Sequence, residues 1–250
     1  MKDLRQLFGT DGIRGVANVD LTPEFVLKVG KAGAKYLSSD DMAVKKILIG
    51  RDTRPSGEFI SGALVSAILA SGISVLDAGI ITTPAVALII KILELDGGIV
   101  ISASHNPVED NSIKFFARAG QKLTDYQEKS IEDYILAEDF KENNAPKGAD
   151  VGRYNILDNA YDLYMGYLKN IFNLNLAGIK VALDCANGAA SILGPLVFRQ
   201  FGADVIPFNC DTTGILINKG CGATHPEFIS RSTVESGADI GFHLTEMQTG

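Results

Sequence analysis

The stretch that decides the fold runs Gly97-Gly98-Ile99-Val100-Ile101-Ser102-Ala103-Ser104-His105-Asn106-Pro107. A short apolar run changes abruptly to small and polar residues, and the proline, which lacks a backbone N–H, ends any continuation of the strand. The pattern predicts a buried strand that delivers Ser104 and His105 to the carboxyl end of a sheet. Ligands bind at that end in open α/β sheets.

A serine on a tight turn beside a histidine can act as a nucleophile or a phosphate carrier. Lys114 follows shortly after and could contact a phosphoryl group or polarise a hydroxyl. The alternative is a plain polar turn followed by an exposed lysine, because a bare Ser-His pair is a weak motif. Residues 110–116 are interpreted as a continuation of the serine loop.

Other short runs rich in Ile or Val are typical of strands that are covered on both faces. With the strand at 98–101, they lie at residues 47–50, 74–76, 181–184, 204–207 and 239–242. Helical patterns alternate with these strands. The alternation predicts an α/β fold of two layered α/β/α domains with mixed, mainly parallel sheets.

The expected helices carry readable start signals. Thr22-Pro23 and Thr83-Pro84 each place a capping hydroxyl before a proline, which is tolerated at the first helical position. The first pair begins a helix that runs to Leu37, and the second begins a helix that covers residues 85–95. Further helices are predicted over residues 57–70, 127–140 and 159–172. His225 is expected to organise the start of another helix.

Two domains are predicted, covering residues 1–150 and 151–250. Between residues 124 and 147 the composition shifts to charged and amide residues, and residues 143–148 have the composition of a loop. The boundary is therefore placed near Asp150. Because the strand-helix rhythm recurs beyond it, the second domain is expected to resemble the first.

Composition and charge argue against nucleic-acid-binding, membrane-spanning and secreted proteins. The formal net charge is −7, which opposes nonspecific binding to nucleic acid. The apolar run at residues 85–95 is interrupted by Lys91 and Glu94, so no membrane segment is predicted, and the first residues lack a secretory hydrophobic region. The three cysteines have no metal-binding spacing and are expected to be reduced. These features predict a cytoplasmic protein, and they leave its oligomeric state open.

Two arginine-bearing loops are candidates for anion binding. Arg14 closes the glycine-rich segment at residues 8–15, and its planar guanidinium suits phosphate. Alone, this segment could equally be a surface turn with a salt-bridged arginine. Arg51 and Arg54 lie between a strand and a helix, where an anion would be favoured. An Arg–Asp ion pair that stabilises the loop is an equally good interpretation of that segment.

Together these segments closely resemble the phosphohexomutase family. The matching stretches are dispersed and ordered over nearly the whole chain: residues 8–15, 50–57, 82–87, 101–107, 110–116, 184–189 and 222–227. The opening Phe-Gly-Thr-Asp-Gly-Ile-Arg-Gly and the later Gly-Ala-Thr-His-Pro-Glu favour the branch that acts on glucosamine phosphates. The Ser-His-Asn-Pro motif fits the whole family.

The resemblance implies a phosphoserine enzyme that interconverts glucosamine 6-phosphate and glucosamine 1-phosphate through a bisphosphate, a step toward cell-wall precursors. Ser104 would carry the phosphoryl group, and Arg14, His105 and Lys114 match the other active-site positions. By the same resemblance, Arg14, Asn106, Arg51 and Lys114 would bind phosphate. Mg²⁺ is the implied cofactor, held in part by the phosphate on Ser104, and sugar phosphates are the implied substrates.

The carboxyl end departs from the family. There, a strand matching residues 238–242 runs into a loop whose three aspartates hold Mg²⁺ with the phosphoserine, whereas this chain reads His-Leu-Thr-Glu-Met-Gln-Thr-Gly over residues 243–250. Suitable codons for that octapeptide, re-read after insertion of one G, spell Ala-Phe-Asp-Gly-Asp-Ala-Asp-Arg, the expected metal loop. We therefore hypothesise a single-base deletion after the Phe242 codon, either natural or from sequencing error.

That hypothesis predicts weak metal binding, loss of the family's third and fourth domains, an incomplete second domain, and little mutase activity. Alternatives are a phosphomannomutase or phosphoglucomutase of the same family, or a noncatalytic module that binds phosphosugars. A serine hydrolase is disfavoured because Ser104 lies in no Gly-x-Ser-x-Gly elbow. A P-loop enzyme is excluded because its Gly-x-x-x-x-Gly-Lys-Ser/Thr motif does not occur.

Overall fold

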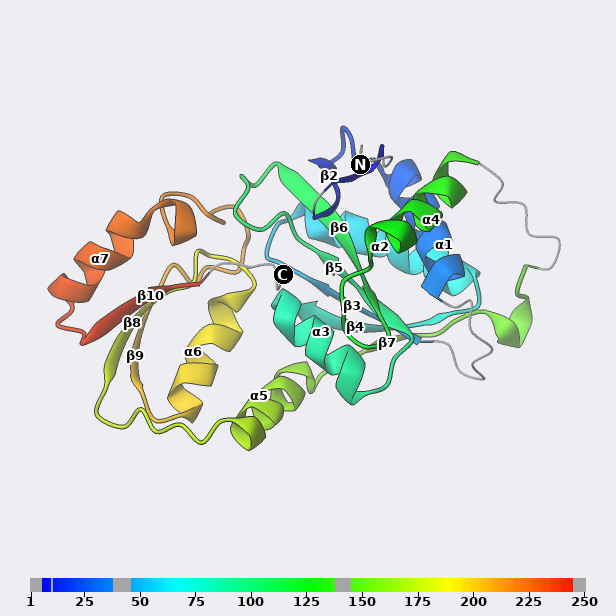
Figure 1. The fold of residues 1–250 in the computed structure, drawn as a ribbon. Coiled ribbons are helices and arrows are strands. Elements are labelled where there is room, and N and C mark those ends of the chain that lie inside the picture. The colour runs from blue at the N-terminus through cyan, green and yellow to red at the C-terminus, as the bar shows by residue number, and fades with distance from the viewer. Residues whose placement is uncertain (1–5, 10, 38–45, 138–144, 245–250) are drawn as a thin grey trace.

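A computed structural model describes residues 6–9, 11–37, 46–137 and 145–244 and shows two sheets flanked by helices (Figure 1). The strands are β1 (Phe8–Gly9), β2 (Gly12–Val16), β3 (Lys46–Arg51), β4 (Ser74–Ile80), β5 (Gly97–Ile101), β6 (Asp110–Ala117), β7 (Tyr154–Ile156), β8 (Lys180–Asp184), β9 (Asp204–Phe208) and β10 (Ile240–His243). The helices are α1 (Pro23–Leu37), α2 (Ser56–Ala70), α3 (Thr83–Ile92), α4 (Asp125–Leu136), α5 (Ala160–Ile171), α6 (Ala190–Gln200) and α7 (Pro226–Glu235), with short 3₁₀ turns at η1 (Gly148–Asp150) and η2 (Gly222–Thr224).

The first sheet has the order β1-β2-β6-β5-β3-β4-β7. Strands β5, β3, β4 and β7 run parallel, whereas β6 is antiparallel to both β5 and β2. The prediction that residues 110–116 continue the serine loop is therefore wrong, because they form β6. Ile113 and Phe115 pack into one core cluster and Phe116 into the other, so both faces of this strand are buried.

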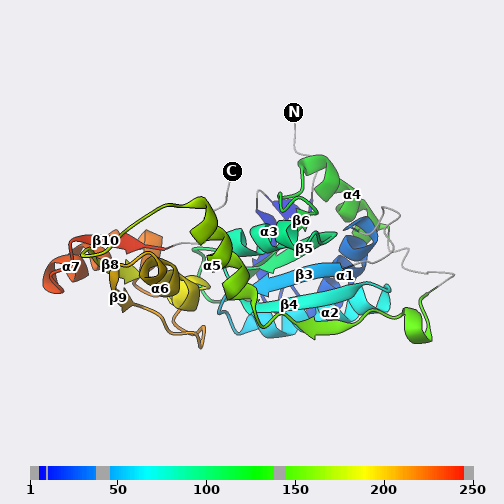
Figure 2. The ribbon, with the colours of Figure 1, turned by 90° about the horizontal axis from the view of Figure 1, so that it is seen from below.

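Helices cover both faces of the first sheet, as Figure 2 shows. Ile47 and Ile49 pack into a core formed with α1, α2 and α4, whereas Leu48 packs into a core formed with α3 and α5. Alternate side chains of one strand thus enter opposite layers, which is what the two-residue repeat of a strand requires. The predicted α/β/α layering is confirmed.

The structure also tests the helix starts. The Thr22 hydroxyl accepts a hydrogen bond from Phe25 N at 3.3 Å, as expected of a cap. Thr83 is instead the first residue of α3, and Thr82 occupies the capping position, so the predicted cap at Thr83 is wrong. Helix α7 begins directly after His225, whose Nδ1 lies 3.1 Å from Glu227 Oε1.

All of the predicted strands form. Helix α5 lies within a residue of its expected range at each end, α6 was not predicted, and the predicted end of α4 at Phe140 lies outside the described residues.

The second sheet has the order β10-β8-β9, with all strands parallel. A core cluster that includes Val181, Leu183 and Phe198 lies between this sheet and α6. The boundary near Asp150 stays a prediction, and β7, which follows it, pairs with β4 of the first sheet.

Candidate active site

Ser104 lies in a tight turn just beyond the end of β5. Its backbone has a φ of 54°, a left-handed conformation that non-glycine residues adopt at an energetic cost. Ser104 N donates to Ser102 Oγ at 3.1 Å, and Asn106 N donates to Ala103 O at 3.1 Å. The Ser104 side chain is half-buried, so the turn presents the hydroxyl at the end of the sheet rather than in the core.

The buried side chain of Arg54 stabilises this turn through hydrogen bonds to its backbone. The Arg54 side chain is 0% exposed and forms an ion pair with Asp52 through Nη1. Its Nη2 donates to Ser104 O at 3.1 Å and to Asn106 O at 2.6 Å. The ion-pair interpretation of this loop is therefore correct for Arg54. The paired guanidinium also fixes two carbonyls of the serine turn.

The second unit of the chain contributes a matching contact. Asn218, in the segment between β9 and η2, donates from Nδ2 to Ser104 O at 2.8 Å and to Asn106 O at 3.0 Å. The carbonyls of Ser104 and Asn106 thus each accept from both Arg54 and Asn218. Because a carbonyl oxygen has two lone pairs, these contacts use its full accepting capacity.

Two cations meet at one carboxylate beside the turn. Lys114 Nζ lies 2.7 Å and Arg14 Nη2 3.2 Å from Asp11 Oδ2. Arg14 Nη1 also donates to Asn106 Oδ1 at 3.4 Å, and Asn106 Nδ2 donates to Asp110 Oδ2 at 2.8 Å. With both carboxylates ionised, the formal charges of Arg14, Lys114, Asp11 and Asp110 sum to zero.

The strand register explains how these cations come together. Arg14 on β2 is opposite Ser112 on β6, and Lys114 on β6 is opposite Val100 on β5. The close approach of β1–β2 to β6 requires glycine at position 12, because its φ is +85° and an added Cβ would lie 2.4 Å from Ile113 O. Lys114, with a side chain only 4% exposed, is a buried cation rather than a solvated one.

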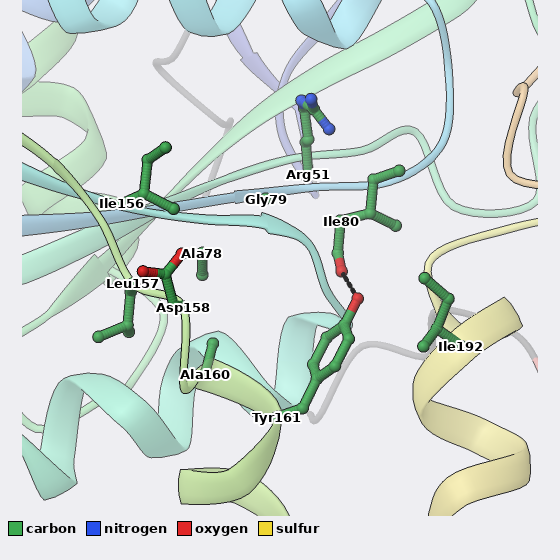
Figure 3. A pocket seen from close by; sticks show the side chains of 10 residues that line it. All are labelled: Arg51, Ala78, Gly79, Ile80, Ile156, Leu157, Asp158, Ala160, Tyr161 and Ile192. Carbon is green, nitrogen blue, oxygen red and sulfur yellow. Dashed lines mark hydrogen bonds between the residues drawn. The ribbon is translucent and has the colours of Figure 1, made fainter.

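The structure thus gathers Arg14, Asn106 and Lys114 around the turn that carries Ser104. The other two predicted site residues are placed differently. His105 is exposed. Arg51 lines a cavity of about 360 Å³ with Asp158 and Tyr161, where the Tyr161 hydroxyl donates to Ile80 O at 2.6 Å (Figure 3).

A second polar turn lies at the carboxyl end of β8. The buried Asp184 accepts from Ala186 N at 2.9 Å and Asn209 Nδ2 at 2.9 Å through Oδ1, and from Gly222 N at 2.8 Å through Oδ2. Burial and the nearby Asp184 charge raise the pKa of the Cys221 thiol to about 11. Through its hydrogen bonds with Asn209 and Gly222, the Asp184 carboxylate stabilises both ends of the segment that carries Asn218.

The adjacent thiols are free cysteines, as the composition predicted. A hydrogen bond between Cys185 and Cys210 raises the pKa of Cys185, and burial adds to that increase. The same hydrogen bond lowers the pKa of Cys210. Over residues 6–9, 11–37, 46–137 and 145–244, no three or more His, Cys, Asp or Glu side chains gather in a way that could hold a metal ion. We assign no step to Mg²⁺.

Of residues 243–250, where the sequence departs from the family, residues 245–250 lie outside the described residues. None of the helices in the described ranges is both long enough and apolar enough to cross a bilayer.

Asp11 and Asn218 were missed from sequence, as was the contact of Arg54 with the serine turn. The Asp52-Thr53-Arg54 spacing does signal a local ion pair, but not that the arginine reaches the serine turn. Asp11 lies within the glycine-rich segment whose arginine was singled out. Asn218 gave no signal, because 114 residues separate it from Ser104 and only the packing of the second unit brings them together.

Comparisons with known proteins show what this chain is similar to. Residues 5–142 match the family domain described as phosphoglucomutase/phosphomannomutase, alpha/beta/alpha domain I. The chain is 47% identical over 237 residues to phosphoglucosamine mutase of Carboxydothermus hydrogenoformans, covering 94% of this chain and 53% of that protein. It is 44% identical over 238 residues to phosphoglucosamine mutase of Desulforamulus reducens, covering 95% and 53%. The chain therefore spans about half the length of the curated relatives that it matches.

The fold also has a close structural neighbour. A crystal structure of a phosphoglucomutase/phosphomannomutase family protein from Burkholderia thailandensis superposes with a TM-score of 0.81 at 24% identity. The match covers 96% of this chain and 52% of the other. At that identity the likeness concerns the fold alone.

Proposed function

This chain belongs to the phosphoglucomutase/phosphomannomutase family, and from that membership we propose that its first unit carries the phosphoserine of a phosphoglucosamine mutase. The supporting observation is the turn itself: Ser104 is half-buried at a strand end, and Arg14 and Lys114 converge beside it on Asp11. Relatives at 44–47% identity are phosphoglucosamine mutases, which favours glucosamine phosphate over other hexose phosphates.

The proposed reaction moves one phosphoryl group in each direction. The P–Oγ bond of phosphorylated Ser104 breaks as a P–O bond forms to the free hydroxyl of a glucosamine monophosphate, and the proton of that hydroxyl moves to Ser104 Oγ. The bisphosphate then returns its other phosphoryl group to Ser104 by the reverse exchange of bonds. His105, exposed next to the serine, is proposed to relay the proton.

The cations are proposed to stabilise the charge that moves. A phosphoserine adds about −1.5 to −2 charges at neutral pH to a cluster whose formal charges otherwise cancel. Phosphate would therefore compete with Asp11 for Arg14 and Lys114. Electrostatic positioning of this kind is the main source of catalysis in phosphoryl transfer. Asn106 is proposed to orient Arg14, which it contacts at 3.4 Å. Arg51 is not included in this proposal.

A chimera tests the function independently of the chain's length. Residues 5–142, which match the family domain, replace the corresponding segment of the Carboxydothermus hydrogenoformans enzyme. We expect the chimera to convert glucosamine 6-phosphate into glucosamine 1-phosphate, and Ser104→Ala in the chimera to reduce turnover to background. An unaltered chimera that folds but has no turnover, or a Ser104→Ala chimera that keeps it, contradicts the proposal. The expectation that the 250-residue chain alone has little turnover stays a prediction.

A further inference from the structure

We propose that Asn218 is a positioning residue through which the second unit holds the serine turn in its transfer geometry. The inference rests on the proposed function, since a position for Ser104 matters to catalysis only if Ser104 carries phosphate. Figure 1 shows where the β5–β6 connection meets the segment between β9 and α7, and the Asn218 amide bridges the two at 2.8 and 3.0 Å.

The bridge acts on a strained part of the chain. Ser104 has a left-handed backbone, which costs an L-residue roughly 1–2 kcal/mol. Such a conformation persists only where surrounding contacts determine it. Arg54 supplies one pair of donors to the carbonyls of Ser104 and Asn106, and Asn218 supplies the other. Loss of the Asn218 amide would leave both carbonyls half satisfied at the strained position.

The segment that presents Asn218 is itself braced against the first unit. Asn218 N donates to Ala186 O at 2.9 Å, and Asn187 Nδ2 donates to Leu216 O at 3.1 Å. The Thr53 hydroxyl donates in turn to Asn187 O at 2.6 Å. Thr53 directly precedes Arg54, so both donors to the serine turn are tied into one connected set of hydrogen bonds. A displacement of the second unit would therefore break or lengthen the hydrogen bonds that Asn218 makes to the serine turn.

An uncharged amide suits this position. The side chain at position 218 must donate to two carbonyl oxygens close to a negatively charged phosphate. A carboxylate there would repel both the carbonyl oxygens and the phosphate. Asn218 has a φ of 58°, which asparagine tolerates better than most residues. Two substitutions preserve that backbone: Asn218→Gly removes the donor, and Asn218→Asp replaces the donor with a negative acceptor.

The test is amide hydrogen exchange on the unphosphorylated 250-residue chain, read at Ser104 and Asn106, whose amides are hydrogen-bonded within the turn. Loss of the two Asn218 hydrogen bonds is expected to speed exchange there roughly tenfold in both variants. Glu94→Gly is the control, because Glu94 also has a left-handed backbone, at φ 50°, but is exposed and precedes β5, at the end of that strand away from the serine turn. It should leave exchange in the serine turn within about twofold of the unaltered chain. Unchanged exchange in both Asn218 variants overturns the inference, as does an equal increase in the control.

A second readout separates this inference from the proposed function. Ser104 phosphorylation by glucosamine 1,6-bisphosphate is followed by phosphopeptide mass spectrometry in a chimera whose residues 5–242 come from this chain and whose remaining part comes from the Carboxydothermus hydrogenoformans enzyme. For Asn218→Gly we expect a roughly tenfold lower maximal rate at an unchanged half-saturating concentration, since the turn and not the sugar site is altered. An unaltered rate overturns the positioning role. If the unaltered chimera is never phosphorylated, the proposed function fails and the positioning role fails with it. The exchange result then still decides whether Asn218 holds the turn.

Discussion

At the scale of single residues, the serine turn combines strain with chemistry. A serine at φ 54° is less stable than a glycine in the same place, because the Cβ of an L-residue crowds the following carbonyl in left-handed backbone. A strained backbone of this kind persists only where other contacts stabilise it. Arg54 and Asn218 supply such contacts. The hydroxyl, not backbone stability, is therefore the reason to place serine here.

This argument predicts that Ser104→Gly has a higher free energy of unfolding than Ser104→Ala, by about 1 kcal/mol after the greater freedom of unfolded glycine is deducted. Both substitutions remove the hydroxyl, so the difference isolates the backbone. Urea unfolding of the two variants measures it. An alanine variant as stable as the glycine variant would show that the turn is not strained.

At the scale of elements, local patterns predicted six of the ten strands in the described residues, β3, β4, β5, β8, β9 and β10, and most of the helices. Ile- and Val-rich runs such as residues 98–101 lead to strands because they can be buried on both faces. Strand β6 was missed because Asn111, Ser112 and Lys114 look like loop residues, yet all three are buried. Their partners lie on β2, on α2 and at Asp11, so the pattern is satisfied only in three dimensions.

The residues of the candidate site likewise fall into those that local sequence patterns identify and those that only the three-dimensional packing brings together. Ser104, Asn106, Arg14 and Lys114 could be selected from sequence because each lies in a motif at a strand end or glycine turn. Arg51 and Arg54 were indistinguishable there. Arg51 ends β3 and its side chain lies against Gly57 on α2, whereas Arg54, beyond the strand, pairs with Asp52 and donates to the serine turn. Asn218 depends on how the two units pack, which no local pattern encodes.

At the scale of the whole molecule, the junction between the two units relies on close backbone approach. Gly214 has a φ of +81°, and an added Cβ would lie 1.8 Å from Thr53 O. Gly220 has a comparable φ of +66° but open space around its Cβ position. Alanine at position 220 therefore measures the free-energy cost of a left-handed backbone alone. Alanine at position 214 adds the cost of displacing the two units from each other.

We predict that Gly214→Ala lowers the free energy of unfolding by about 3 kcal/mol, whereas Gly220→Ala lowers it by about 1 kcal/mol. Gly214→Ala should also speed hydrogen exchange in the serine turn, since it displaces the segment that carries Asn218. Chemical unfolding and exchange of both variants measure these effects. Equal destabilisation by the two substitutions would mean that the junction does not depend on contact at Thr53.

The central claim is that Ser104 holds a transferable phosphoryl group. Its most direct test is to incubate the chimera that carries residues 5–142 of this chain in the Carboxydothermus hydrogenoformans enzyme with glucosamine 1,6-bisphosphate, locate phosphate by peptide mass spectrometry, and then add glucosamine 6-phosphate as acceptor. The account predicts phosphate on Ser104 that leaves when the acceptor is added. A chimera in which Ser104 stays unmodified, or in which its phosphate remains after the acceptor is added, would contradict it.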